Sequence, residues 1–188
     1  KFKKQLFNDY KIHKWIFIWV ALFILIGFIK LQSPEMREDQ YHTDLPIQYL
    51  KNHTIMLPSK EQIMVSASPQ LGEMSYLISI FLGSKETTRY IHFIFYILVL
   101  LLLYSLSKDK QYKFAIIAPL LFATAPEVIR ETSSQYTDFQ WIFLFLLAVF
   151  ILTKNKLSMN GIFITGIIIG AMISTKLWTI AFLISLIF

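Results

Sequence analysis

The sequence predicts an all-α membrane protein, a bundle of about five or six transmembrane helices with a long first outer loop. Hydrophobic residues make up 55% of the 188 residues and charged residues 16%, whereas about 25% of the residues of a soluble domain are charged. The mean hydropathy is +0.55. The apolar residues are gathered into uncharged blocks near the length of about 20 residues that crosses a bilayer. We therefore expect residues 1–188 to form a single transmembrane domain.

The lysines and the acids alternate along the chain. Segments 1–14, 108–113 and 154–156 hold ten lysines and two acids, and the other ten acids lie in the segments between them. Lysine-rich loops remain on the cytoplasmic side of a membrane, so this pattern predicts a cytoplasmic N-terminus. The net charge of +6 is then a signal of topology, and we expect no nucleic-acid partner. The absence of cysteine excludes disulfides and thiolate metal ligands.

The first apolar block, Trp15–Ile29, is expected to run outward from the cytoplasm. A basic flank before an apolar run also fits a signal peptide, but Leu31–Pro34 lacks the small residues of a cleavage site. Residues 31–83 then form the long outer loop. A first short helix is predicted to open at Thr43–Pro46, where a capping hydroxyl precedes a proline in the first turn.

A second short helix of the outer loop is predicted between Ser68–Gln70 and Gly83. Its apolar residues follow at helical spacing from Leu71 to Leu82. This stretch is too short to cross a bilayer. We therefore expect an interface helix, lying along the membrane surface.

Further crossings follow the outer loop. Thr87–Ser107 returns inward. Phe114–Ala125 is short and contains Pro119, so a kinked span and a re-entrant segment both fit it, and the lysine segments on either side favour a span. The remaining apolar stretches are an inward crossing, an outward crossing and the start of another helix: Thr137–Thr153, Gly161–Ser174 and Leu177–Phe188.

Four acids lie within ten residues of the outer loop: Glu35, Glu38, Asp39 and Asp44. A carboxylate just past a membrane span can act as the general base on an acceptor hydroxyl if it is ionised and partly shielded from water. Acids are also common in solvated loops, so residue type alone leaves both roles open. Tyr41 and His42 lie among these acids. His42 is a candidate base or metal ligand, although capping or packing is the more frequent role of a single histidine.

Three charged residues interrupt or border apolar stretches on the outer side. Glu73 lies in the interface helix, where it either stabilises the helix dipole or belongs to a site. Asp138 lies at the outer end of a span, where an acid is costly unless it faces a cavity or a partner. A helix N-terminus also favours an acid there. Lys176 either extends its ammonium to the interface or neutralises an anion such as a lipid phosphate.

Four motifs follow one another along the chain. They are an acid-containing first outer loop, an interface helix with a Pro-x-x-Gly-Glu-x-x-Tyr stretch, an outer loop that leads into a span with an acid near its start, and a glycine-rich span that ends in lysine: Glu38–Pro46, Pro69–Tyr76, Ala125–Asp138 and Gly166–Lys176. In this order and at the outer side of the membrane, they resemble the N-terminal part of the GT-C fold membrane glycosyltransferases. This class depends on polyprenyl-phosphate sugars and includes the protein mannosyltransferase and aminoarabinose transferase families. Its members usually have more spans, so we expect the 188 residues to be part of a longer protein.

The resemblance implies transfer of a sugar from a polyprenyl-phosphate carrier to an acceptor hydroxyl at the outer membrane face. In that class the acid of the first outer loop is the catalytic base, which corresponds to Asp39, with Glu38 as the alternative. The further residues that would bind substrate are Tyr41, His42, Glu73, Asp138 and Lys176. No nucleotide is needed, in agreement with the absence of a glycine-rich phosphate loop. Two carboxylates could hold a divalent metal, as in some relatives. The implied partners are the lipid-linked sugar and membrane lipids.

Two other functions remain open. A transporter or channel subunit would place ionisable residues near the bilayer midplane, whereas the interiors of the long apolar blocks have almost none. The second is a non-catalytic membrane subunit held in a larger complex. A protein that ended near Phe188 would favour this second reading.

Overall fold

The computed structural model describes residues 2–32, 40–55, 70–109, 115–154 and 158–182. Side chains are described from Lys14 onward, except for residues 40, 41 and 109 within these segments. Every regular element in the described segments is a helix and none is a strand. The predicted all-α class is therefore confirmed for this part of the chain.

Two helices are long and apolar enough to cross a membrane. α1 runs from Phe2 to Leu31 and α5 from Thr87 to Asp109. Their most apolar windows, Lys14–Leu31 and Thr87–Lys108, each have a mean hydropathy of 2.1. These windows contain the whole of the predicted first and second spans.

Two further apolar helices follow later in the chain. α8 (Asp138–Lys154) and α9 (Met159–Thr175) have 17 residues each, which corresponds to about 26 Å. Their bounds lie within two residues of the predicted stretches, Thr137–Thr153 and Gly161–Ser174. Ser158 caps α9, since its hydroxyl accepts a hydrogen bond from the Gly161 amide. α9 is followed by a short 3₁₀ helix, η2 (Leu177–Thr179).

Within the predicted third crossing, Phe114–Ala125, the structure forms the short helix α6 (Ile117–Thr124), and a second short helix, α7 (Pro126–Glu131), follows it in the predicted outer loop. Ala125 separates them with an extended backbone, φ −63° and ψ 127°, as expected for a residue before proline. Pro119 lies in the first turn of α6, where the N–H that proline lacks has no helical partner. The interruption therefore lies at Ala125–Pro126 and not at Pro119. The eight residues of α6 cover about 12 Å, too short to cross a bilayer alone.

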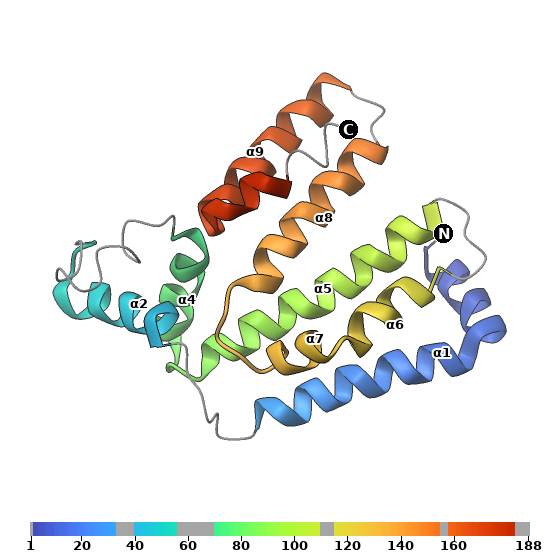
Figure 1. The fold of residues 1–188 in the computed structure, drawn as a ribbon, viewed down its shortest axis with the longest axis horizontal. Coiled ribbons are helices and arrows are strands. Elements are labelled where there is room, and N and C mark those ends of the chain that lie inside the picture. Colours follow the sequence, from blue (N-terminus) through green and yellow to red (C-terminus); the bar gives the residue numbers. More distant parts are fainter. Residues whose placement is uncertain (1, 33–39, 56–69, 110–114, 155–157, 183–188) are drawn as a thin grey trace.

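The helices form a bundle around α5. Figure 1 shows α1 and α6 along one side of α5, and α8 followed by α9 on the other. The C-terminal end of α1 and the N-terminal ends of α5 and α8 lie toward the same end of the bundle. Aromatic packing joins α5, α6 and α8 there. The buried ring of Phe139 lies 4.5 Å from the ring of His92, 5.3 Å from that of Tyr96 and 6.2 Å from that of Phe122.

Two short helices of the predicted outer loop pack against each other at that end. α2 (Gln40–Asn52) begins before the predicted start at Thr43, so Pro46 lies inside the helix and not in its first turn. α4 (Leu71–Leu82) ends before Gly83 as predicted. Gly72 brings α4 close to the start of α8, because a Cβ atom at Gly72 would lie 2.5 Å from Cγ2 of Thr137.

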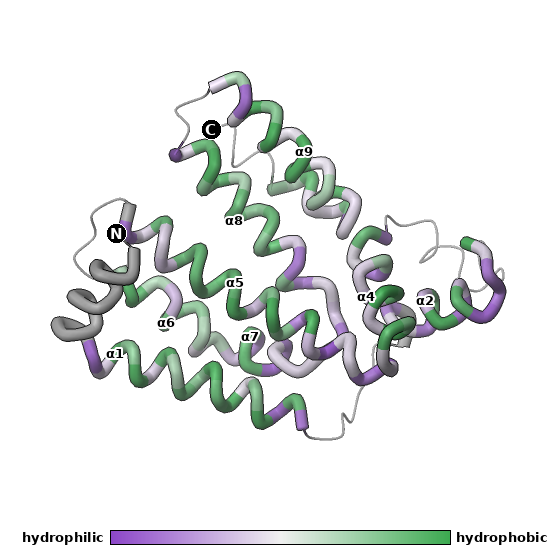
Figure 2. The backbone as a smooth tube through the Cα atoms, turned by 180° about the vertical axis from the view of Figure 1, so that it is seen from behind, coloured by the Kyte–Doolittle hydropathy of each residue, from purple (hydrophilic) through white to green (hydrophobic). Residues whose placement is uncertain are grey.

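The exterior of the bundle is largely apolar. Figure 2 shows hydrophobic residues along α5, α8 and the described part of α1, with hydrophilic residues concentrated at helix ends and in α2. Exposed large apolar side chains occur on α1, α4 and α9: Trp15, Phe28, Ile29, Phe81, Leu82, Phe163 and Ile167. Soluble monomers rarely expose large contiguous apolar patches. The surface therefore fits a lipid environment.

Candidate functional site

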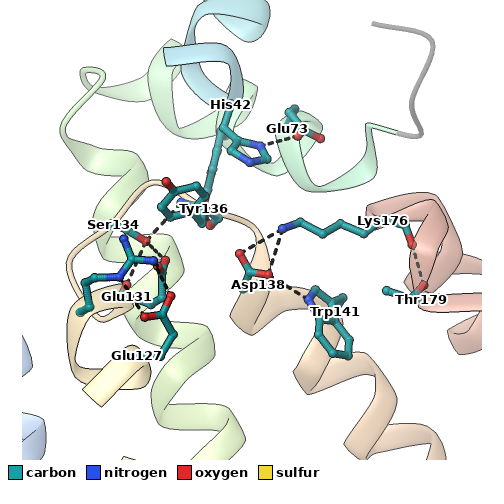
Figure 3. Close-up of polar contacts among 12 residues, drawn as sticks. His42, Glu73, Glu127, Glu131, Ser134, Tyr136, Asp138, Trp141, Lys176 and Thr179 are labelled. Atoms are coloured by element: carbon teal, nitrogen blue, oxygen red, sulfur yellow. Dashed lines mark hydrogen bonds and ion pairs between the residues drawn. The ribbon is translucent and has the colours of Figure 1, made fainter. Parts of the chain in front are cut away.

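A cavity of about 410 Å³ opens at the end of the bundle where α2 and α4 pack. It is lined by residues from α2, α7, the loop before α8, α8 itself and the residue after α9: His42, Glu127, Val128, Arg130, Glu131, Tyr136, Asp138, Phe139, Ile142 and Lys176. Figure 3 shows most of its polar side chains. The cavity therefore joins three of the four sequence motifs directly, and the second motif, in α4, contacts its wall.

An ion pair joins the start of α8 to the end of α9. Nζ of Lys176 lies 2.9 Å from Oδ1 and 3.0 Å from Oδ2 of Asp138. The indole N–H of Trp141 donates to Oδ1 of Asp138 at 3.2 Å (Figure 3). Lys176 was expected either to reach the interface or to neutralise an anion, and in this structure the anion it neutralises is Asp138. Asp138 is also in the first turn of α8, so both of its expected roles are present.

A second polar pair joins α2 to α4. Nδ1 of His42 lies 2.5 Å from Oε1 of Glu73, and the two residues are only 1% and 3% exposed. The His42 ring meets the Tyr136 ring edge-on, with centroids 5.8 Å apart. The other carboxylate oxygen of Glu73 has no hydrogen-bond partner among the described residues. Glu73 therefore lies behind His42, which itself faces the cavity.

The hydroxyl of Tyr76 extends the same buried network by donating a hydrogen bond to the carbonyl of Tyr136. Burial, and next the nearby Glu73 carboxylate, raises the pKa of the Tyr76 phenol well above its ordinary value. Tyr76 therefore remains a neutral donor that fixes the loop before α8 against α4.

Charged residues of α7 form the opposite wall. Arg130 contacts Glu127 and also Glu131, with Nη2 of Arg130 2.7 Å from Oε1 of Glu131. The Ser134 hydroxyl donates to Oε2 of Glu131 at 2.8 Å. Burial raises the pKa of Glu131, although Ser134 and Arg130 oppose that shift. At Glu127, which is exposed, the hydrogen bond from Arg130 lowers the pKa.

The loop between α7 and α8 forms part of the cavity wall, and its burial is unexpected from the sequence. Residues 132–136 were predicted to lie in an outer loop and Thr137 to begin the next span, yet most of the polar residues here are buried: Thr132, Ser133, Ser134, Gln135 and Thr137. Buried polar groups need hydrogen-bond partners, and Nε2 of Gln135 donates to the Lys85 carbonyl at 3.1 Å. A run of small polar residues after a short helix has no periodicity that would predict such burial.

The predicted site residues fall into three groups. His42, Asp138 and Lys176 line the cavity, and Glu73 contacts His42. The backbone of Tyr41 lies in α2, but its side chain is outside the described residues, as are Glu38 and Asp39 entirely. Arg130 and Glu131 also line the cavity, and neither was among the site residues predicted from the sequence. Within the described residues, no group of three or more histidines and acids is arranged to hold a metal ion.

A second, apolar cavity of about 360 Å³ lies between α4, α5, α8 and α9. Its lining includes Leu71, Ile78, Leu144 and Thr175. Thr175 is adjacent in sequence to Lys176 of the polar cavity. An amphipathic molecule with a charged group and a long apolar chain would match this succession of surfaces.

The polar cavity offers carboxylates, an ammonium, a guanidinium and aromatic rings to a ligand. Such groups can accept hydrogen bonds from hydroxyls, neutralise a leaving phosphate and take up a proton. No protein-family model, curated protein or solved structure matches this chain. The function must therefore be inferred from the residues of the chain itself.

Proposed function

We propose that this protein is the N-terminal part of a multi-pass membrane glycosyltransferase of the GT-C type. It would move a sugar from a polyprenyl-phosphate carrier to an acceptor hydroxyl at the outer membrane face. The observation that carries the proposal is the cavity in which His42, Asp138 and Lys176 meet. These residues come from three separate motifs of the sequence resemblance and from three different helices or their ends.

The lysine distribution supports the membrane arrangement in this proposal. The N-terminus and segments 108–113 and 154–156 are cytoplasmic, so the end of the bundle that holds α2 and α4 faces outward. α1, α5, α8 and α9 each cross the membrane, the stretch Phe114–Ala125 with α6 forms the remaining crossing, and α7 lies on the outer side. Acids and the cavity are concentrated at the outward end, as interface chemistry requires and midplane transport does not.

The apolar cavity supports a lipid-linked donor. The isoprenoid chain would lie along Leu71, Ile78 and Leu144, while the phosphate would approach Lys176 at the adjacent polar cavity. A bound phosphate competes with Asp138 for the Lys176 ammonium, because both anions need the same charge partner. Binding of the donor would thus loosen the contact between α8 and the end of α9.

The transfer step is a direct displacement. The acceptor oxygen attacks the anomeric carbon and its proton passes to the carboxylate of Asp39 or, alternatively, Glu38. The bond between the anomeric carbon and the phosphate oxygen breaks, and the lipid phosphate leaves with its electron pair. Lys176 neutralises the charge that develops on this leaving group. A single displacement of this kind inverts the anomeric configuration.

The test is sugar transfer in membranes that contain the full-length protein, with a polyprenyl-phosphate sugar as donor. Asp39→Asn is expected to lower the rate by about 10²–10⁴-fold, the usual effect of removing a general base. Glu35→Gln is the matched control, since it neutralises a nearby acid outside the motif and should retain most activity. Immunoblots of the membrane fraction check that each variant is inserted.

Two outcomes would change the proposal. Normal transfer by Asp39→Asn together with loss in Glu38→Gln would move the base by one residue. Normal transfer by both variants would exclude this loop from the chemistry and reduce the resemblance to one of fold.

A further inference from the structure

We propose that the tryptophans of this protein mark the two surfaces of the bilayer, and that an aromatic cluster beside Lys176 holds the cavity at the level of the lipid headgroups. The inference rests on the membrane location in the proposed function, and it adds the depth at which the site lies. The aromatic cluster consists of four residues from α8 and from the segment after α9: Trp141, Phe145, Trp178 and Phe182.

The rings of the aromatic cluster pack on one another. The Trp141 centroid lies 4.8 Å from that of Trp178 and 5.1 Å from that of Phe182, and the rings of Phe145 and Phe182 are 6.2 Å apart. Trp141 is 9% exposed, whereas Trp178 and Phe182 are 51% and 38% exposed. The cluster is therefore ordered by its own packing and presents two aromatic rings outward.

One side of the aromatic cluster is polar. The indole N–H of Trp141 donates to Asp138, and the Lys176 ammonium lies 5.9 Å from the centre of the Trp178 ring. An aromatic ring that faces apolar surroundings on one side and a charged group on the other is typical of the membrane–water interface. The ion pair of the polar cavity is thus at the depth of the cluster.

The other two tryptophans lie at the opposite end of the molecule. Trp15 and Trp19 of α1 are 68% and 53% exposed, and the Lys14 ammonium lies 5.4 Å from the Trp15 ring. The 17 residues from Trp15 to Leu31 cover about 26 Å of helix, near the roughly 30 Å of a hydrocarbon core. Leu31 ends α1 at the end of the bundle where α8 begins.

The arrangement favours lipid over a protein partner. A protein partner would account for one exposed aromatic patch. It would not account for exposed tryptophans toward opposite ends of the bundle, Trp15 and Trp178, each beside a lysine, with exposed apolar side chains such as Phe28 and Ile167 between them. The cavity then opens at the headgroup level, where a lipid phosphate lies.

The inference can be tested by fluorescence quenching in vesicles of phosphatidylcholine and phosphatidylglycerol. The chain has four tryptophans, so proteins with a single tryptophan are obtained by changing the other three to phenylalanine. The quenchers are lipids brominated near the glycerol or near the chain end, and iodide added only outside. The control is Ile167→Trp in a tryptophan-free protein, because Ile167 is central in α9 and 58% exposed. Circular dichroism checks that each protein keeps its helices.

The expected result is strongest quenching of Trp178 and of Trp15 by the shallow brominated lipid, and of the Ile167→Trp control by the deep one. In vesicles of uniform orientation, external iodide should reach only one of Trp178 and Trp15. The inference would be overturned if the deep brominated lipid quenched Trp178 as strongly as it quenches the control. It would also be overturned if iodide quenched Trp178 and neither brominated lipid did. Transfer activity is measured separately, so a cluster at the wrong depth in an active protein would refute this inference and leave the proposed function intact.

Discussion

The buried pair of His42 and Glu73 gives a sharp test of how α2 is held against α4. Three variants are compared with the unmodified chain: His42→Leu, Glu73→Leu, and the double substitution. The two side chains are only 2% and 4% exposed and their nearest polar atoms lie 2.5 Å apart. Water therefore cannot replace either partner when the other is removed.

The magnitudes follow from what each substitution leaves behind. His42→Leu leaves the Glu73 carboxylate buried with no described partner on either oxygen, and an uncompensated buried charge costs about 3–5 kcal/mol. Glu73→Leu leaves one ring nitrogen of His42 without its partner, which costs about 1–3 kcal/mol. The double variant removes both polar groups, so its loss should be smaller than that of His42→Leu alone.

The assay is unfolding of the purified protein in mixed detergent micelles, followed by circular dichroism. Glu127→Gln is the control, because it disrupts a contact with Arg130 in which both side chains are exposed, and exposed ion pairs contribute little. The effects of substituting two residues in contact are not additive. The stability losses of His42→Leu and Glu73→Leu, added together, should therefore exceed the loss in the double variant by at least about 1 kcal/mol. Strictly additive losses, or a His42→Leu variant as stable as the control, would refute the role assigned to this pair.

Two further predictions concern packing and pH. Gly72→Ala should destabilise the protein because its Cβ would lie 2.5 Å from Cγ2 and 2.9 Å from Cβ of Thr137. Gly166→Ala is the control and should not destabilise it, since a Cβ there would have no atom within 4 Å. Unfolding in detergent compares the two variants, and equal stability would contradict the close approach of α4 to α8. Burial raises the pKa of Glu131 in the folded protein, so the folded state holds its proton to higher pH than the unfolded state does. Stability should therefore fall as pH rises from the ordinary glutamate pKa to the raised one. Glu131→Gln should lack this fall, and a pH profile identical to that of the unmodified chain would show that Glu131 does not cause it.

Much of the helical framework could be predicted from local signals. The apolar blocks, the lysines at their ends and the glycine after Leu82 led to bounds for α4, α5, α8 and α9 within a few residues of those observed. Such signals are local because a helix in an apolar environment satisfies its own backbone hydrogen bonds. The start of α2 was misplaced at Thr43, where a hydroxyl and a proline imitate a helix start. In the structure Thr43 is fully buried inside the helix, so packing outweighs the local signal.

The charged residues of the site could also be singled out one at a time. Glu73, Asp138 and Lys176 lie in or beside apolar stretches, where an unpartnered charge is costly. Their partners could not be predicted, because His42 and Glu73 are 31 residues apart and Asp138 and Lys176 are 38 apart. Which charges meet depends on how α2 packs on α4 and α8 on α9.

The sequence by itself determined that this chain forms apolar helices and that most of its acids lie in segments that alternate with the lysine-rich ones. Composition and periodicity act within one helix, and they are enough for that result. Only the tertiary structure decided that residues 132–137 fold inward, that Glu131 becomes a buried acid beside Arg130, and that Lys176 is neutralised by Asp138. The physical reason is that burial and pairing depend on contacts between different helices. Composition and periodicity within one segment do not specify those contacts.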